Sequence, residues 1–196
     1  MRLVLASSNC GKLDELGDLL APAGYQLIAQ SDLGVGDAEE TGRTFIENAL
    51  LKARHAARIA GMPALADDSG LLVDALDGEP GLRSARYAGE HGNAAANNAL
   101  LLERLLDVPA DRRGAHFYCV LVLLRSADDP QPLIAEGSWR GSILAAPRGA
   151  RGFGYDPLFL PNGQTLSAAE LDPAMKNRIS HRGQALAALR EKLAQS

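Results

Sequence analysis

The chain has 196 residues, of which 46% are hydrophobic, so it can bury a full core and we expect one domain over residues 1–196. Its 20 basic and 24 acidic residues give a net charge of −4 at pH 7, which argues against nucleic acid or a membrane surface as a partner. Any anionic ligand must therefore be held by a local group of residues.

Hydrophobic periodicity predicts strands and helices that alternate along the chain. Thr44 and Glu47 form a capping-box pattern that starts one of the helices. The segment 116–125 is almost continuously apolar, as in a central strand, and 133–140 is expected to be its antiparallel neighbour. The predicted strands are 2–6, 25–29, the segment around Asp67, 116–125 and 133–140, and the predicted helices run from the 7–12 turn to about 21, from 44 to 60, from 93 to 106 and through Leu186, Leu189 and Leu193 near the end.

Polar or glycine-rich connections separate these elements. Residues 31–42 form a loop that carries several acids, 77–92 is rich in glycine and proline, and 147–157 is rich in glycine. We interpret the second as a long functional loop. Because strands and helices interleave and one hairpin is expected, the predicted class is α/β with a mixed sheet.

The cysteines indicate a reducing compartment. Cys10 and Cys119 are the only two, and neither stands in a CxxC or Cys/His cluster. This argues against structural zinc and against a disulfide-stapled secreted fold. The longest apolar run, 119–124, is too short to span a bilayer, and no signal peptide is expected. We therefore expect a cytoplasmic protein.

The first strand leads through a polar turn into the first helix. Free backbone N–H groups and the positive end of a helix dipole meet at such a junction, where hydroxyls and an ammonium could hold a triphosphate. The turn is not a Walker A loop, because no glycine stands five residues before Gly11 and Leu13 follows Lys12. An ordinary helix cap with a solvated lysine is the alternative. The residues concerned are Ser7, Ser8, Asn9, Cys10, Gly11 and Lys12.

Two adjacent acids, Asp67 and Asp68, interrupt an apolar stretch. An ionised carboxylate removed from water needs a cation or a set of donors, so the pair suggests a magnesium site. The alternative is a strand-to-turn corner in which both acids are solvated. From these residues alone both interpretations stay open.

Taken together, several blocks resemble the non-canonical purine nucleoside triphosphate pyrophosphatases, also called inosine triphosphate or Ham1-like pyrophosphatases. The resemblance runs in order from the first strand to the last helix. It implies an elongated mixed β-sheet flanked by helices, two lobes with a central nucleotide cleft, and a homodimer. The blocks are Ser8, Asn9, Gly11, Lys12 and Glu15; Glu40–Gly42, Thr44, Phe45, Glu47, Asn48 and Lys52; Ala66–Gly70; Pro80, Gly81 and Ser84–Tyr87; Phe153–Pro157; and Lys176, Asn177 and Ser180–Arg182.

The resemblance also implies the activity: inosine, deoxyinosine and xanthosine triphosphates are hydrolysed to the monophosphate and pyrophosphate, with Mg²⁺ as cofactor. Asp68 would be the general base and a metal ligand, with Ser69 beside it, and Glu40 would help to hold the metal. The 7–12 turn would bind the triphosphate. The residues expected around the nucleoside and its phosphates are Phe153, Gly154, Tyr155, Asp156, Lys176, His181 and Arg182. One departure is Ser7–Ser8, where many relatives have Thr and Gly.

A mechanism follows from these roles. Asp68 would deprotonate the water that attacks the α-phosphorus, while Lys12 and magnesium neutralise the triphosphate. His181 and Arg182 can donate to a 6-oxo group, and arginine cannot accept from the 6-amino group of adenine, so such a site can discriminate by about 10⁴. Phe153 would stack on the purine with little selectivity.

Each of these residues also has a structural interpretation. Phe153 could be a core aromatic, Asp156 a turn residue, and residues 180–182 a helix start; Arg148 and Arg151 are expected to be solvated. Trp139 is expected to pack or to contact a subunit. A haloacid-dehalogenase-type phosphatase is disfavoured because the two acids are adjacent. The remaining alternatives are a Maf-like pyrimidine nucleotide pyrophosphatase and a non-hydrolytic nucleotide-binding module.

Overall fold

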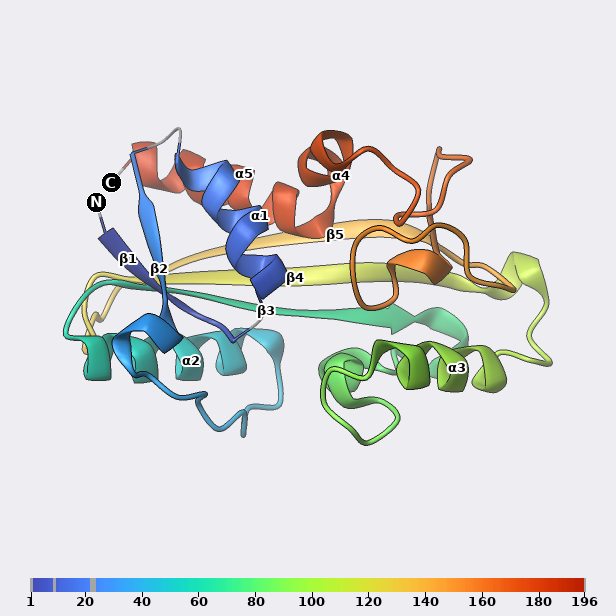
Figure 1. Ribbon diagram of the computed structural model, residues 1–196, viewed down its shortest axis with the longest axis horizontal. Coiled ribbons are helices and arrows are strands. Elements are labelled where there is room, and N and C mark those ends of the chain that lie inside the picture. The colour runs from blue at the N-terminus through green and yellow to red at the C-terminus, as the bar shows by residue number, and fades with distance from the viewer. Residues whose placement is uncertain (1, 9, 22–23, 196) are drawn as a thin grey trace. The chain divides into compact units, whose positions relative to one another are not determined.

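The computed structural model describes residues 2–8, 10–21 and 24–195, without the side chains of residues 10, 14, 15, 18 and 19. Within these residues, six strands form one sheet in the order β2-β1-β3-β4-β5-β6 (Figure 1). Strand β1 runs parallel to both β2 and β3, and β6 runs antiparallel to β5, so the sheet is mixed, as predicted. The strands are β1 (Arg2–Ala6), β2 (Gln26–Ala29), β3 (Ala64–Val73), β4 (Gly114–Leu124), β5 (Leu133–Ile143) and β6 (Phe159–Pro161), and the α-helices are α1 (Cys10–Leu20), α2 (Phe45–Ala60), α3 (Ala94–Arg104), α4 (Pro173–Ile179) and α5 (His181–Ala194).

The chain divides into two compact units, and β3, β4 and β5 contribute residues to both. The first unit consists of Met1–Asp68, Cys119–Gly137 and Arg182–Ser196, and the second unit of Ser69–Tyr118 and Ser138–His181.

In the first unit, strand β1 alternates its side chains between two helical layers. Figure 1 shows α1 and α5 on one side of this strand and α2 on the other. Leu3 and Leu5 belong to a buried leucine cluster with α1 and α5. The opposite residues, Val4 and Ala6, are also buried, and β1 contacts α2. The buried side chains of α2 are mostly small; they include Ala49, Ala53, Ala56 and Ala57.

The predicted capping box starts α2. Thr44 Oγ1 accepts from Glu47 N at 3.1 Å, and Glu47 Oε2 accepts from Thr44 N at 2.9 Å. One residue pair also ties the preceding acidic loop to this helix, because Gly42 N donates to Asn48 Oδ1 at 2.8 Å. A Cβ on Gly42 would lie 2.6 Å from that oxygen, so a larger residue would push the loop away. The helix start and the position of the loop are therefore set together.

In the second unit, aromatic rings and leucines of α3 form the core. Phe117 contacts Phe159 edge to face at a centroid distance of 4.7 Å. Trp139, 5.2 Å from Phe159, is 6% exposed, so it packs in this core. The strand expected over 116–125 and the helix expected over 93–106 are confirmed as β4 and α3, with shifts of one or two residues.

Several short elements differ from the sequence prediction. The 77–92 segment, expected as a loop, contains a 3-10 helix over Gly81–Arg86. Strand β6 and helix α4 were not predicted, and α4 is separated from α5 at Ser180. With three to seven residues, such elements are too short to show a clear hydrophobic period. No helix among the described residues is long and apolar enough to cross a membrane.

Candidate active site

The N-terminal turn and the two aspartates meet in the first unit. The helix α1 begins at Cys10, so Gly11 and Lys12 lie in its first turn rather than in the preceding loop. The Lys12 ammonium is ion-paired with the carboxylate of Asp67 in β3. The turn after β1 and the aspartate pair therefore lie next to each other.

The rest of the predicted turn is described only in part. Ser7 is partly buried and its N–H donates to Leu5 O at 3.0 Å, while Ser8 is exposed. Asn9 lies outside the described residues, and the side chain of Cys10 is not described.

Asp67 is fully buried and receives donors from three other elements. Besides Lys12 of α1, Arg182 Nε of α5 donates to Asp67 Oδ2 at 3.1 Å, and Cys119 Sγ of β4 does so at 3.2 Å. Burial alone would raise the pKa of Asp67, but Lys12 and Arg182 together hold it well below the usual range. Asp67 is thus an ionised anchor for two cations. Arg182, expected to contact base and phosphate, uses its Nε for this pair.

Asp68 faces a different cation. Lys52 Nζ of α2 lies 2.7 Å from Asp68 Oδ1 and 3.2 Å from Glu40 Oε1. Burial raises the pKa of Asp68 even though Lys52 opposes the shift. For Lys52, burial acts to lower the pKa, and the two carboxylates outweigh it and raise the value. A carboxylate with a raised pKa is a stronger base, which suits proton transfer.

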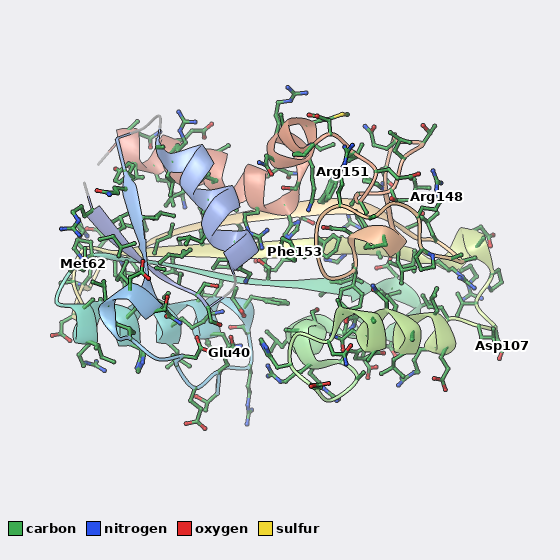
Figure 2. All side chains as sticks on the ribbon, viewed as in Figure 1. Glu40, Met62, Asp107, Arg148, Arg151 and Phe153 are labelled. Atoms are coloured by element: carbon green, nitrogen blue, oxygen red, sulfur yellow. The ribbon has the colours of Figure 1, made fainter. Side chains whose placement is uncertain are left out.

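Lys52 is a site residue to which the sequence analysis assigned no role. Its side chain is only 13% exposed, although it stands on the polar side of α2. A sequence signal for this role does exist. Lys52 is the only lysine of an alanine-rich helix that follows an acidic loop and precedes the aspartate pair. Figure 2 labels Glu40 on the loop that precedes α2.

The carboxylate oxygens around Lys52 are ligands that suit a hard divalent cation. The oxygens of Glu40 and Asp68 already converge on one positive charge, and carboxylate oxygens are ligands that Mg²⁺ prefers. Among the described residues, no group of three or more His, Cys, Asp or Glu could hold a metal by itself. Mg²⁺ is commonly bound by one or two carboxylates together with substrate phosphates. The carboxylates of Glu40 and Asp68 would therefore be enough ligands from the protein.

A second group of predicted residues lies in the second unit. Asp156 Oδ2 accepts from Lys176 Nζ at 2.7 Å and from Phe153 N at 2.8 Å. The Lys176 ammonium also lies 5.1 Å from the centroid of the Phe153 ring, in cation–π geometry. Gly152 has a φ of 74°, and a Cβ there would lie 2.1 Å from the Asp156 carboxylate. The buried aspartate therefore shapes the turn and places Lys176 against the ring.

Phe153 itself is 37% exposed, so it is not the core aromatic of the alternative interpretation. Figure 2 labels it on the loop that precedes Asp156, together with Arg148 and Arg151. Both arginines are exposed, as expected, and Arg148 pairs with Glu170 at 2.9 Å.

Tyr155 and His181 are both buried. The Tyr155 hydroxyl donates to Ser84 O at 2.8 Å, and burial raises its pKa. His181 is 6% exposed, with its ring stacked on Phe117 at 4.8 Å. Gly154 O accepts from Asn98 Nδ2 of α3, a contact that the sequence did not indicate. Ser69, the first residue of the second unit, is partly buried.

The two groups differ in chemistry. The first unit offers lysines and carboxylates suited to phosphates and a divalent cation, and the second unit offers an exposed aromatic ring with a cation against it. With the mixed sheet, these features are typical of an α/β enzyme that hydrolyses nucleotides.

The chain belongs to the Ham1 family, whose model matches residues 3–192. The match covers both units, and it confirms the family resemblance inferred from the sequence blocks.

Known relatives are similar over nearly the whole chain. A dITP/XTP pyrophosphatase of Xanthomonas campestris pv. campestris strain 8004 is 63% identical over 97% of this chain and 96% of that relative. The dITP/XTP pyrophosphatase of Vibrio cholerae is 55% identical over 94% and 92%, respectively. A solved HAM1 protein from Coxiella burnetii has a TM-score of 0.91 and 48% identity, with 100% of both chains covered.

Proposed function

We propose that this protein hydrolyses dITP, ITP and XTP to the nucleoside monophosphate and pyrophosphate. The observation that carries the proposal is the buried Asp68 carboxylate, whose pKa is raised and which faces Lys52 and Glu40. The names of relatives that are 55–63% identical support the same reaction. In the cell, it would remove deaminated purines before they enter DNA or RNA.

The chemistry requires a base and neutralisation of the polyphosphate. Asp68 accepts a proton from the attacking water at a carboxylate oxygen, the new bond forms at the α-phosphorus, and the bond from that phosphorus to the β-phosphate oxygen breaks. Lys12 and Lys52 supply positive charge in the same unit. Mg²⁺, held by Asp68 and Glu40, would lower the pKa of water and stabilise the pyrophosphate leaving group.

Asp67 has a different role in this proposal. Three donors occupy its carboxylate and its pKa is lowered, so it is a poor base. Its ion pairs fix the side chains of Lys12 and Arg182 in position, where their positive charges can attract the anionic substrate. Fixed charges of this kind need little reorganisation when negative charge develops.

The second unit supplies the purine contacts. The exposed Phe153 ring stacks on the base, and the Lys176 ammonium near the ring keeps its orientation. His181, the last residue of this unit, donates to the 6-oxo group that hypoxanthine and xanthine share. Adenine, with a 6-amino donor, would leave that donor unpaired. We also propose that the protein forms a homodimer and acts in the cytoplasm.

The direct test is a substrate panel. The purified protein is incubated with Mg²⁺ and the triphosphates of deoxyinosine, xanthosine, guanosine, adenosine, thymidine and uridine, and the released ion is identified by ³¹P NMR. We expect pyrophosphate from dITP and XTP and little from ATP. Orthophosphate as the product, preference for pyrimidines, or binding without turnover would each overturn the proposal in favour of one of the alternatives.

A further inference from the structure

We propose that Asn98 is a positioning residue for the turn 153–156, which presents Phe153 to the purine. The inference rests on the proposed function and deepens it, because it assigns part of the base affinity to a side chain of α3 outside the predicted site. No block of the family resemblance includes this residue.

The contact is specific. Asn98 Nδ2 donates to Gly154 O at 3.0 Å, and the partner, a carbonyl, requires that the amide nitrogen face the turn. The Asn98 side chain is partly buried, and its Oδ1 is buried without a hydrogen-bond partner among the described residues. Among the described residues, the Asn98 amide therefore acts through its nitrogen, toward Gly154 O.

The turn 153–156 is tied to other segments at Asp156, which pairs with Lys176 of α4 and accepts from Ala169 N at its carbonyl, whereas Phe153 stands between two glycines. Gly152 and Gly154 flank Phe153 with φ values of 74° and 61°, and glycine loses more conformational freedom on folding than any other residue. Within the turn, Asp156 Oδ2 accepts from Phe153 N. That bond closes the turn but does not attach it to a helix.

Two hydrogen bonds between described residues attach the turn to the layer formed by α3 and the 3-10 helix Gly81–Arg86. One is the contact from Asn98 to Gly154 O, and the other runs from the Tyr155 hydroxyl to Ser84 O. The layer is itself fixed by Asn97, whose Oδ1 accepts from Ala88 N at 2.8 Å. Consecutive asparagines of α3 thus hold two different segments, and Asn98 holds the one that carries Phe153.

The consequence is a selective effect on substrate binding. Without the Asn98 donor, Gly154 and the neighbouring Phe153 sample more conformations, so ordering them costs free energy when the purine binds. The proton transfer at Asp68 is unchanged. The expected signature is a raised KM with a nearly constant kcat.

The test compares Asn98→Leu with Asn93→Ala. Asn93 is the N-cap of the same helix and accepts from Ala96 N at 3.0 Å, so its loss weakens α3 without touching the turn. We expect Asn98→Leu to raise KM for dITP about three- to ten-fold, as for the loss of one hydrogen bond, with kcat within about two-fold. Asn93→Ala should lower Tm and leave KM unchanged.

A double-mutant cycle with Phe153→Ala decides whether the effect passes through the ring. In that background, Asn98→Leu should have almost no further effect on KM. A full effect there, or equal KM values for Asn98→Leu and Asn93→Ala, would overturn the proposal.

Hydrogen exchange at the Phe153 amide gives a readout that is independent of turnover. It should be faster in Asn98→Leu and unchanged in Asn93→Ala; unchanged exchange in Asn98→Leu would also overturn the proposal. If the wild-type protein released no pyrophosphate from dITP, the proposed function would fail, while the exchange experiment would still decide the role of Asn98.

Discussion

The Lys12 ammonium in the first turn of α1 is ion-paired with the buried carboxylate of Asp67 in β3. This pair joins the turn after the first strand to the aspartate pair more than fifty residues later. Because Asp67 also binds Arg182 and Cys119, it is committed to three donors. Asp68, which faces Lys52 and Glu40, is the carboxylate left to act as the base.

Replacement of Asp67 by alanine should be strongly destabilising. It leaves the cations of Lys12 and Arg182 without their shared anion, and breaking a buried ion pair in this way typically costs about 3–5 kcal/mol. The free energy of unfolding, measured with urea near neutral pH, should fall by about that amount. An Asp32→Ala variant at an exposed acid is the control and should change stability little.

The same carboxylate should contribute to acid sensitivity. Because the pKa of Asp67 is lower in the folded than in the unfolded protein, its stabilisation is present above the unfolded value and is lost as pH falls through the folded value. Below the usual aspartate pKa, the stability of Asp67→Ala should therefore change less steeply with pH than that of the wild type. Parallel curves would show that Asp67 is not the group responsible.

Asp68→Asn should separate binding from turnover. The amide is similar in shape but cannot accept the proton from water, so we expect kcat to fall by about 10²-fold or more. Affinity for dITP, measured by calorimetry with Ca²⁺ in place of Mg²⁺, should change far less. Near-normal turnover in this variant would remove Asp68 from the base role.

The pH dependence of kcat/KM should report Asp68. Activity requires its ionised form, and because its pKa is raised, the acid limb should lie above the usual aspartate range. Lys52 opposes that shift, so Lys52→Met should move the limb to still higher pH as well as lower the rate. The exposed Arg58→Met on the same helix is the control and should leave the limb in place. A limb that is unmoved in Lys52→Met would contradict the coupling.

Metal dependence should involve Glu40. We expect EDTA to abolish turnover, and Mg²⁺ to restore it, because the phosphates need a divalent counter-charge. Glu40→Gln should shift the Mg²⁺ activation curve to higher concentration, since one of two carboxylate ligands is lost. Its neighbour Glu39 is exposed, and Glu39→Gln should leave the curve unchanged. Identical curves for both variants would exclude Glu40 as a ligand.

Much of the fold could be predicted from local signals. The capping box at Thr44 and the leucines of the last helix were recognised because a cap and a helical period are written in consecutive residues. Helix α4 was not predicted because its seven residues make fewer than two helical turns, too few for a clear hydrophobic period. The helical position of Lys176 was therefore not predicted either. The separation of α4 from α5 at Ser180 was missed for the same reason.

The sequence by itself determined the mixed α/β class, the family, and the types of side chain available for phosphate, metal and purine. Only the tertiary structure decided which partner each charge takes: Asp67 with Lys12 and Arg182, and Asp68 with Lys52. The physical reason is that adjacent strand residues point to opposite faces of a sheet. Two neighbouring aspartates therefore meet different helices, and the chemistry of each depends on burial and charges contributed by residues distant in sequence.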